Sequence, residues 1–144
     1  MTFPTQPSAI SIRVLCDPAD GSINLYLRST RRSGGHFKPP RLVKFRAKLA
    51  DAWHAAANGQ TMTGRLELTI ACFYKRRSKV DPSIDDLAFG DADSPIKAIQ
   101  DSVKDAGIIV DDVIIVRVSS EKFLDRKNPR VEATLSRRTT FAPG

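Results

Sequence analysis

The stretch Asp91-Ala92-Asp93-Ser94-Pro95-Ile96-Lys97 decides how the second half of the chain is interpreted. Its Ser-Pro pair is typical of a helix start, with serine at the N-cap and proline at the first helical position. The apolar spacing that follows predicts a helix over 95–106, and Gly107 suits the left-handed residue that ends many helices. We therefore expect the two aspartates of the stretch to lie at the positive end of a helix dipole.

A second acidic pair, Asp111-Asp112, follows the apolar residues 108–110. Neighbouring carboxylates repel each other, and Mg²⁺ removes this conflict because it prefers oxygen ligands. Tertiary folding could therefore bring Asp112 next to Asp91 and Asp93 as a metal site. The other interpretation is that Asp93 helps to cap the helix and that the later pair forms a solvated turn, since short Asp patterns are common.

The spacing of these residues resembles that of the RusA family of Holliday-junction resolvases. Both have Asp-x-Asp, a lysine four residues after the second Asp, an Asp four residues later, then a glycine and an apolar stretch that ends in Asp-Asp. The similarity covers about 91–118 without a gap. One difference is Ser94, where the family usually has asparagine. Residues 84–87 could also be aligned to the motif, but only Asp91 and Asp93 keep the lysine and the later Asp-Asp pair in register.

The resemblance implies a small homodimeric, Mg²⁺-dependent endonuclease that cuts four-way DNA junctions, with Mn²⁺ as a possible substitute. It assigns Asp91, Asp93 and Asp112 as metal-binding catalytic carboxylates and Lys97 as the essential lysine. The alternative for Lys97 is an ordinary surface ion pair with Asp101, four residues later. Such enzymes are common in bacteriophages and prophages, so the resemblance is consistent with a bacterial cell and with a phage or prophage origin, and the sequence does not decide between them.

Two other functions remain open at this point. One is a metal nuclease that acts on other branched DNA, and the other is a junction-binding protein that does not cleave. The complete acidic set and the lysine favour catalysis, since a binding protein could dispense with them.

The chain has 144 residues, of which 41% are hydrophobic and 27% are charged, as in an ordinary globular domain. We expect a flexible tail over 1–8, the endonuclease domain over 9–138 and a frayed end over 139–144. No apolar run approaches the ~20 residues that span a bilayer, and the N-terminus resembles no secretion signal. Cys16 and Cys72 make no disulfide framework, so we expect reduced thiols, a cytoplasmic location and no membrane partner.

The net charge of +7 predicts a polyanionic partner, most commonly nucleic acid. Acidic residues gather over 81–112, whereas basic residues gather over 28–48 and 75–79. The alternative is that these cations are merely solvated. His36 could be a general base, although a lone histidine in a loop is more often incidental. The expected contacts to the DNA backbone are Arg28, Arg31, Arg32 and Lys38 in a loop, and Lys75, Arg76, Arg77 and Lys79 after a strand.

Alternation of apolar and polar residues predicts strands over 9–15, 65–75 and 130–136. Both faces of the 65–75 strand carry apolar residues, which indicates a central strand covered on both sides. The Val- and Ile-rich run over 112–118 predicts a further buried strand, and the polar residues 119–126 predict a turn.

Helical spacing of apolar residues predicts one more helix, over about 41–57. Its expected core stripe consists of Leu42, Phe45, Leu49, Trp53 and Ala56. Together these elements predict a single α/β (α+β) domain with one mixed four-stranded sheet and two helices, as the RusA resemblance also implies.

Overall fold

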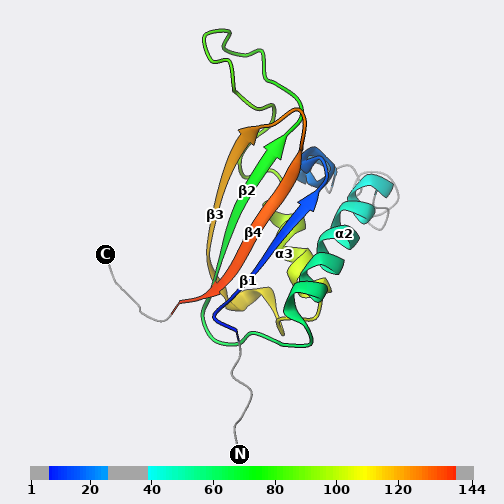
Figure 1. Ribbon diagram of the computed structural model, residues 1–144, viewed down its shortest axis with the longest axis vertical. Helices are drawn as coiled ribbons and strands as arrows, with labels where there is room; N and C mark the ends of the chain where they lie inside the picture. Colours follow the sequence, from blue (N-terminus) through cyan, green and yellow to red (C-terminus); the bar gives the residue numbers. More distant parts are fainter. Residues whose placement is uncertain (1–6, 26–38, 139–144) are drawn as a thin grey trace, which may run out of the picture.

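The computed structural model describes residues 7–25 and 39–138. Its elements are β1 (Ala9–Leu15), η1 (Pro18–Gly21), α2 (Pro40–Ala57), β2 (Leu66–Tyr74), α3 (Ile96–Asp105), η2 (Asp112–Ile114), β3 (Ile115–Leu124) and β4 (Arg130–Arg137). The strands form one mixed sheet in the order β1-β4-β2-β3, in which β2 and β3 are parallel and the other pairs are antiparallel. The helices α2 and α3 lie on the same face of this sheet (Figure 1). The predicted α+β domain is confirmed.

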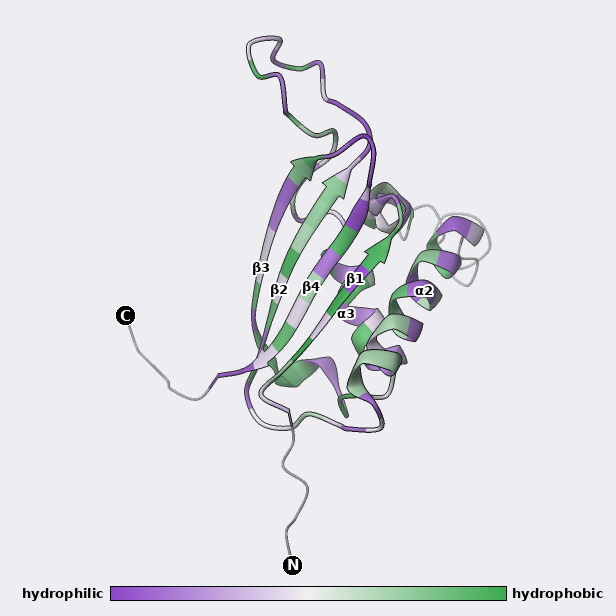
Figure 2. Ribbon diagram, in the orientation of Figure 1, coloured by the Kyte–Doolittle hydropathy of each residue, from purple (hydrophilic) through white to green (hydrophobic). Residues whose placement is uncertain are grey.

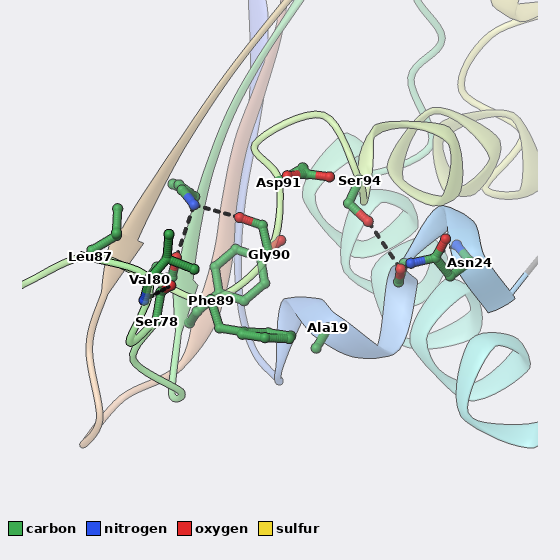
Figure 3. A pocket seen from close by; sticks show the side chains of 13 residues that line it. Ala19, Asn24, Ser78, Val80, Leu87, Phe89, Gly90, Asp91 and Ser94 are labelled. Carbon is green, nitrogen blue, oxygen red and sulfur yellow. Dashed lines mark hydrogen bonds between the residues drawn. The ribbon is translucent and has the colours of Figure 1, made fainter. Parts of the chain in front are cut away.

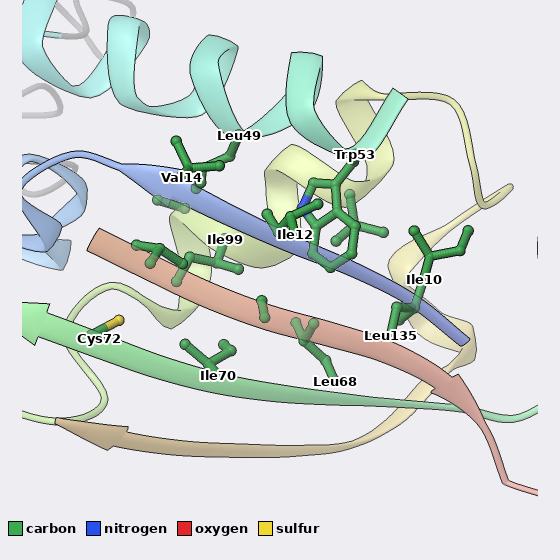
Figure 4. Close-up of a cluster of buried hydrophobic side chains, with 14 of the residues drawn as sticks. Ile10, Ile12, Val14, Leu49, Trp53, Leu68, Ile70, Cys72, Ile99 and Leu135 are labelled. Carbon is green, nitrogen blue, oxygen red and sulfur yellow. The ribbon is translucent and has the colours of Figure 1, made fainter. Parts of the chain in front are cut away.

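The core fills the space between α2, α3 and the sheet, where Leu49 and Trp53 of α2 point toward the strands (Figure 4). The Trp53 indole N–H donates to Ser102 Oγ of α3 at 3.2 Å, so the polar end of the ring is satisfied while the ring is buried. The predicted stripe is confirmed except at its end, because Ala57 is buried and Ala56 is exposed. None of the helices in the described ranges combines the length and apolar character needed to cross a membrane.

Within residues 7–25 and 39–138, no helix lies on the outer face of the sheet, so the expectation that β2 is covered on both sides is wrong for this part of the chain (Figure 1). The predicted central position of β2 is confirmed, because this strand lies between β4 and β3. The apolar residues on the outer side are covered by side chains of neighbouring strands instead. Phe73 stacks on Phe123 with ring centroids 4.9 Å apart, and the Arg130 guanidinium lies 3.7 Å from the Phe73 centroid. Polar and apolar residues occur together along the strands of the sheet (Figure 2).

Strand β3 differs most from its prediction. It begins at Ile115 after a short 3-10 turn, continues through the predicted turn to Leu124, and is largely exposed rather than buried. Its parallel pairing with β2 extends to Tyr74 and Leu124. Backbone hydrogen bonds to β2 stabilise the strand whatever its side chains are, and an edge strand of a sheet with one open face tolerates polar residues.

Both cysteines are free thiols, as predicted for residues without a disulfide partner. Burial raises the pKa of Cys16 to about 11 and that of Cys72 to about 12. The thiols therefore stay protonated at neutral pH, and Cys72 serves as a core residue on the inner face of β2.

Candidate active site

The loop that carries Asp91 and Asp93 is anchored by two side chains of β3. Ser120 Oγ donates to the carbonyl of Ala92 at 2.7 Å. Lys122 Nζ donates to the carbonyl of Ala88 at 2.9 Å and also to that of Gly90. Residues two apart on a strand point to the same side, so β3 presents both donors to one loop. This arrangement fixes the backbone from which the two aspartates project.

The same loop is anchored on its other side by the segment after η1. The Ile23 N–H donates to the Ser94 carbonyl at 2.9 Å, and the hydroxyls of Ser22 and Ser94 lie 3.0 Å apart (Figure 3). Ser94 was predicted to cap α3, but the helix begins at Ile96 with Pro95 at the N-cap and no side-chain cap. The cap prediction is wrong because the Ser94 hydroxyl is engaged with Ser22. The predicted left-handed Gly107 after α3 is confirmed, with φ of 75°.

Asp91 and Asp93 are both exposed and close to the end of β2. Burial raises the pKa of the Tyr74 hydroxyl, and the charges of Asp91 and Asp93 contribute to that shift. The phenol therefore stays protonated at neutral pH and can donate a hydrogen bond. Mg²⁺ is commonly held by one or two carboxylates together with waters and substrate phosphates, so the donor chemistry of this pair fits the cation.

Asp112 lies elsewhere in the same chain. It opens η2, and its neighbour Asp111 is 3.9 Å from Lys104 in the last turn of α3. The hydrogen bond shared with Asp111 raises the pKa of Asp112. Asp93, in contrast, precedes the first turn of α3, a ten-residue helix that is about 15 Å long.

The expected convergence of three aspartates is therefore not found within one copy of the chain. In residues 7–25 and 39–138, no three His, Cys, Asp or Glu side chains are grouped as a metal site. The pair Asp91 and Asp93 is present on one loop before α3, whereas Asp112 follows Asp111, which contacts Lys104 in the last turn of that helix.

Lys97 lies in the first turn of α3, immediately after the aspartate loop. Its Nζ is 3.8 Å from Asp101 Oδ2, which confirms the predicted ion pair, and Arg46 Nη1 is also 3.8 Å from the same oxygen. Asp101 thus orients Lys97 from one helical turn away. The ion pair leaves the side chain of Lys97 55% exposed, on the surface next to the aspartates.

The basic cluster after β2 begins a long arm that projects beyond the sheet (Figure 1). The two limbs of the arm pair at its base, where Ser78 N–H donates to Leu87 O at 2.7 Å and Phe89 N–H donates to Arg76 O at 2.9 Å. Arg77 donates to the Ile84 carbonyl at 3.2 Å, so its guanidinium also stabilises the arm.

The structure adds a cation that the sequence analysis missed. Arg126, from the hairpin between β3 and β4, lines a hollow of about 510 Å³ together with Arg76, Arg77 and Lys79. We call this hollow the basic pocket. Residues 119–126 were predicted as a turn, and so Arg126 was not expected near the arm. Strand β3 instead extends to Leu124, and the hairpin that follows it places Arg126 beside the arm. The other predicted DNA contacts, Arg28, Arg31, Arg32 and Lys38, and also His36, lie outside the residues that the structure describes.

A second pocket, of about 460 Å³, lies beside Asp91 (Figure 3). We call it the Asp91 pocket. Its walls come from η1, the end of β2, the base of the arm and the aspartate loop. The residues used below are Ser22, Asn24, Tyr74, Val80, Leu87 and Phe89.

Loss of the β3 anchor should impair catalysis without unfolding the protein. We expect Ser120→Ala to lower the rate of DNA cutting by about 10-fold, as is typical for groups that orient metal ligands. The cause is the lost hydrogen bond to Ala92, between the two aspartates. Single-turnover cleavage and thermal unfolding, measured side by side, test this. Ser119→Ala is the control, because Ser119 is exposed on the opposite side of β3; equal rates for the two variants would contradict the prediction.

The chain was compared with models of known protein families. A family model described as endodeoxyribonuclease RusA matches residues 21–136, which is most of the 144-residue chain. The matched region includes β2, β3, all but the last residue of β4, the helices α2 and α3, and the whole aspartate loop. No curated protein matches the chain.

Proposed function

Because the chain belongs to the RusA family of endodeoxyribonucleases, which resolve Holliday junctions, we propose that it makes paired, symmetric cuts in four-way DNA junctions with the aid of a divalent cation. The observation that carries this proposal is the exposed pair Asp91 and Asp93, on an anchored loop beside the basic cluster 75–79. Cations that hold the DNA backbone next to carboxylates that hold a metal are the two requirements of a metal-dependent nuclease.

Asp91 and Asp93 would hold Mg²⁺, with Mn²⁺ as a substitute. When bound, such an ion supplies an activated water for attack on phosphorus and neutralises charge on the departing oxygen. Lys97 would stabilise the charge that develops on the scissile phosphate, since its ammonium lies on the adjacent first turn of α3. Asp101 keeps Lys97 in place through their ion pair.

The substrate has two-fold symmetry, so two symmetric cuts require two sites related by a two-fold axis, as in a homodimer. This symmetry also offers an explanation for the separation of the acidic residues. We propose that Asp112 joins Asp91 and Asp93 from the second copy of the dimer, because α3 keeps it apart from them within one copy.

Binding of the junction would rest on the basic cluster and on the basic loop before α2. The proposed contacts to phosphates are Lys75, Arg76, Arg77 and Lys79, with Arg28, Arg31, Arg32 and Lys38 from the loop. Such contacts fix the DNA in position and make affinity depend strongly on salt.

A cleavage assay on a synthetic four-way junction tests the proposed function. We expect symmetric nicks in Mg²⁺ or Mn²⁺, none in EDTA, and little cutting of a linear duplex of the same sequence. Equal rates on flaps and forks would instead support a metal nuclease for general branched DNA. Tight binding without any cutting in either cation would support a junction-binding protein.

Removing a single cation of the basic cluster should make the affinity for DNA less dependent on salt concentration. We expect Lys79→Ala to reduce the slope of log affinity against log salt concentration by about 0.9, the contribution of one phosphate contact. Titrations of a fluorescent junction at several salt concentrations measure this slope. Arg13→Ala is the control, because Arg13 is an exposed cation on β1, the edge strand farthest from β3. A slope that is the same for both variants would remove Lys79 from the DNA interface.

A further inference from the structure

We propose that the Asp91 pocket receives an unstacked nucleobase of the strand that is cut, and that Phe89 is the surface on which this base stacks. The inference rests on the proposed function, because it takes branched DNA as the substrate. It assigns to the pocket a role in choosing the nucleotide at the cut.

The lining of the Asp91 pocket suits a flat, mostly apolar ligand with polar edges. Tyr74, Leu87 and Phe89 contribute apolar and aromatic surface, whereas Asn24 and Ser22 contribute polar groups at one side. Ligand pockets are generally apolar with a few placed polar groups and have volumes of roughly 300–1,000 Å³, so a pocket of about 460 Å³ has the size and character of one. The Asn24 amide can both donate to and accept from a base edge.

Phe89 is an exposed aromatic residue whose ring and backbone both have partners. Its side chain is 44% exposed although the Arg76 guanidinium lies 4.2 Å from the ring centroid. The backbone of Phe89 donates to Arg76, and Lys122 binds the carbonyls of the residues on either side, Ala88 and Gly90. A fixed aromatic ring with a cation against it is the combination on which single-stranded nucleic acids stack.

Phe89 lies between the basic pocket and the mostly apolar Asp91 pocket, and this position suggests the path of a bound DNA strand. Phe89 and Val80 line both the basic pocket and the Asp91 pocket. The basic pocket is lined by four cations and, in the part of the chain that the structure describes, by no carboxylate. A strand with a phosphate in the basic pocket would therefore place its next base at Phe89 and continue toward Asp91.

Branched DNA can supply such a base at low cost. Unstacking and unpairing a nucleotide from a regular duplex costs a few kcal/mol, and the cost is least where pairing or stacking is already interrupted. Where a strand crosses from one arm to another at a branch point, its two successive nucleotides no longer stack on each other. The pocket would then favour cutting beside the branch and would discriminate among bases through its polar side.

The test uses 2-aminopurine, whose fluorescence reports stacking, placed in turn at each position beside the cut of a four-way junction. The cleavage-inactive Asp93→Asn variant serves as the parent. We expect the fluorescence of one position to change on binding, and we expect that change to disappear with Phe89→Ala and to persist with Phe89→Tyr. In the cleaving protein, Phe89→Ala should cut about 10-fold more slowly with a weaker base preference, as expected for the loss of one stacked base.

Phe123→Ala is the matched control, because Phe123 is 37% exposed and stacks on Phe73 on the outer face of the sheet. A fluorescence change that survives Phe89→Ala would overturn the inference. The same probe in a short single-stranded oligonucleotide reports the pocket independently of the junction. Failure of the intact protein to cut four-way junctions, with a Phe89-dependent signal on the single strand, would therefore overturn the proposed substrate and retain the base pocket.

Discussion

Asp93→Asn should abolish cutting of a four-way junction while the affinity for that junction stays close to that of the parent. The substitution keeps the shape of the side chain but removes one charge from the pair Asp91 and Asp93, and with it a ligand of the proposed ion. We expect a loss on the order of 10²–10³ in the single-turnover rate, the magnitude seen when a group that stabilises charge in the transition state is removed. Binding should persist because the basic cluster is unchanged.

Asp86→Asn is the matched control for this prediction. Asp86 is an exposed aspartate on the arm, five residues before Asp91, and its loss changes the net charge of the protein by the same amount. We expect it to cut at the rate of the parent. Full cleavage by Asp93→Asn, or an equal loss in both variants, would remove the assignment of the aspartate loop as the active site.

Side-chain periodicity predicted most of the fold because four elements expose one face and bury the other. The strands β1, β2 and β4 and the helix α2 lie within a residue or two of their predicted bounds. Strand β3 could not be predicted in this way. Its residues after Val118 are largely polar, and only pairing with β2, a partner some 50 residues earlier in the chain, keeps them extended.

The candidate site shows the same limit. Spacing predicted that Asp91, Asp93 and Lys97 lie close together in the chain's local structure, and the structure places them on one loop and the first turn of α3. It missed the anchors Ser120 and Lys122, which lie on the part of β3 that had been predicted as a turn. Spacing also carries no information about which end of a helix a later residue will reach, and so it could not predict that Asp112 would lie at the C-terminal end of α3.

The position of Asp112 leads to the second large prediction, on mixed dimers. We expect Asp93→Asn and Asp112→Asn to be inactive alone and to regain nicking when they are co-expressed with different tags and purified as the mixed dimer. If Asp112 acts across the dimer, one site of the mixed dimer carries both substitutions and the other carries none. The intact site should nick one strand, so the product should be a nicked junction rather than two resolved duplexes.

The matched control is a mixed dimer of Asp93→Asn and Asp91→Asn, whose substitutions fall on the same loop of each copy. Each of its sites contains one substitution under either arrangement, so it should remain inactive. If instead all three carboxylates act from one chain, the Asp93→Asn and Asp112→Asn mixture also has one defect in each site and should be equally inactive. Restored nicking in the first mixture alone would therefore show that the two copies share each site. We expect this result because Asp91 and Asp93 precede the ten-residue helix α3, whereas Asp112 follows it.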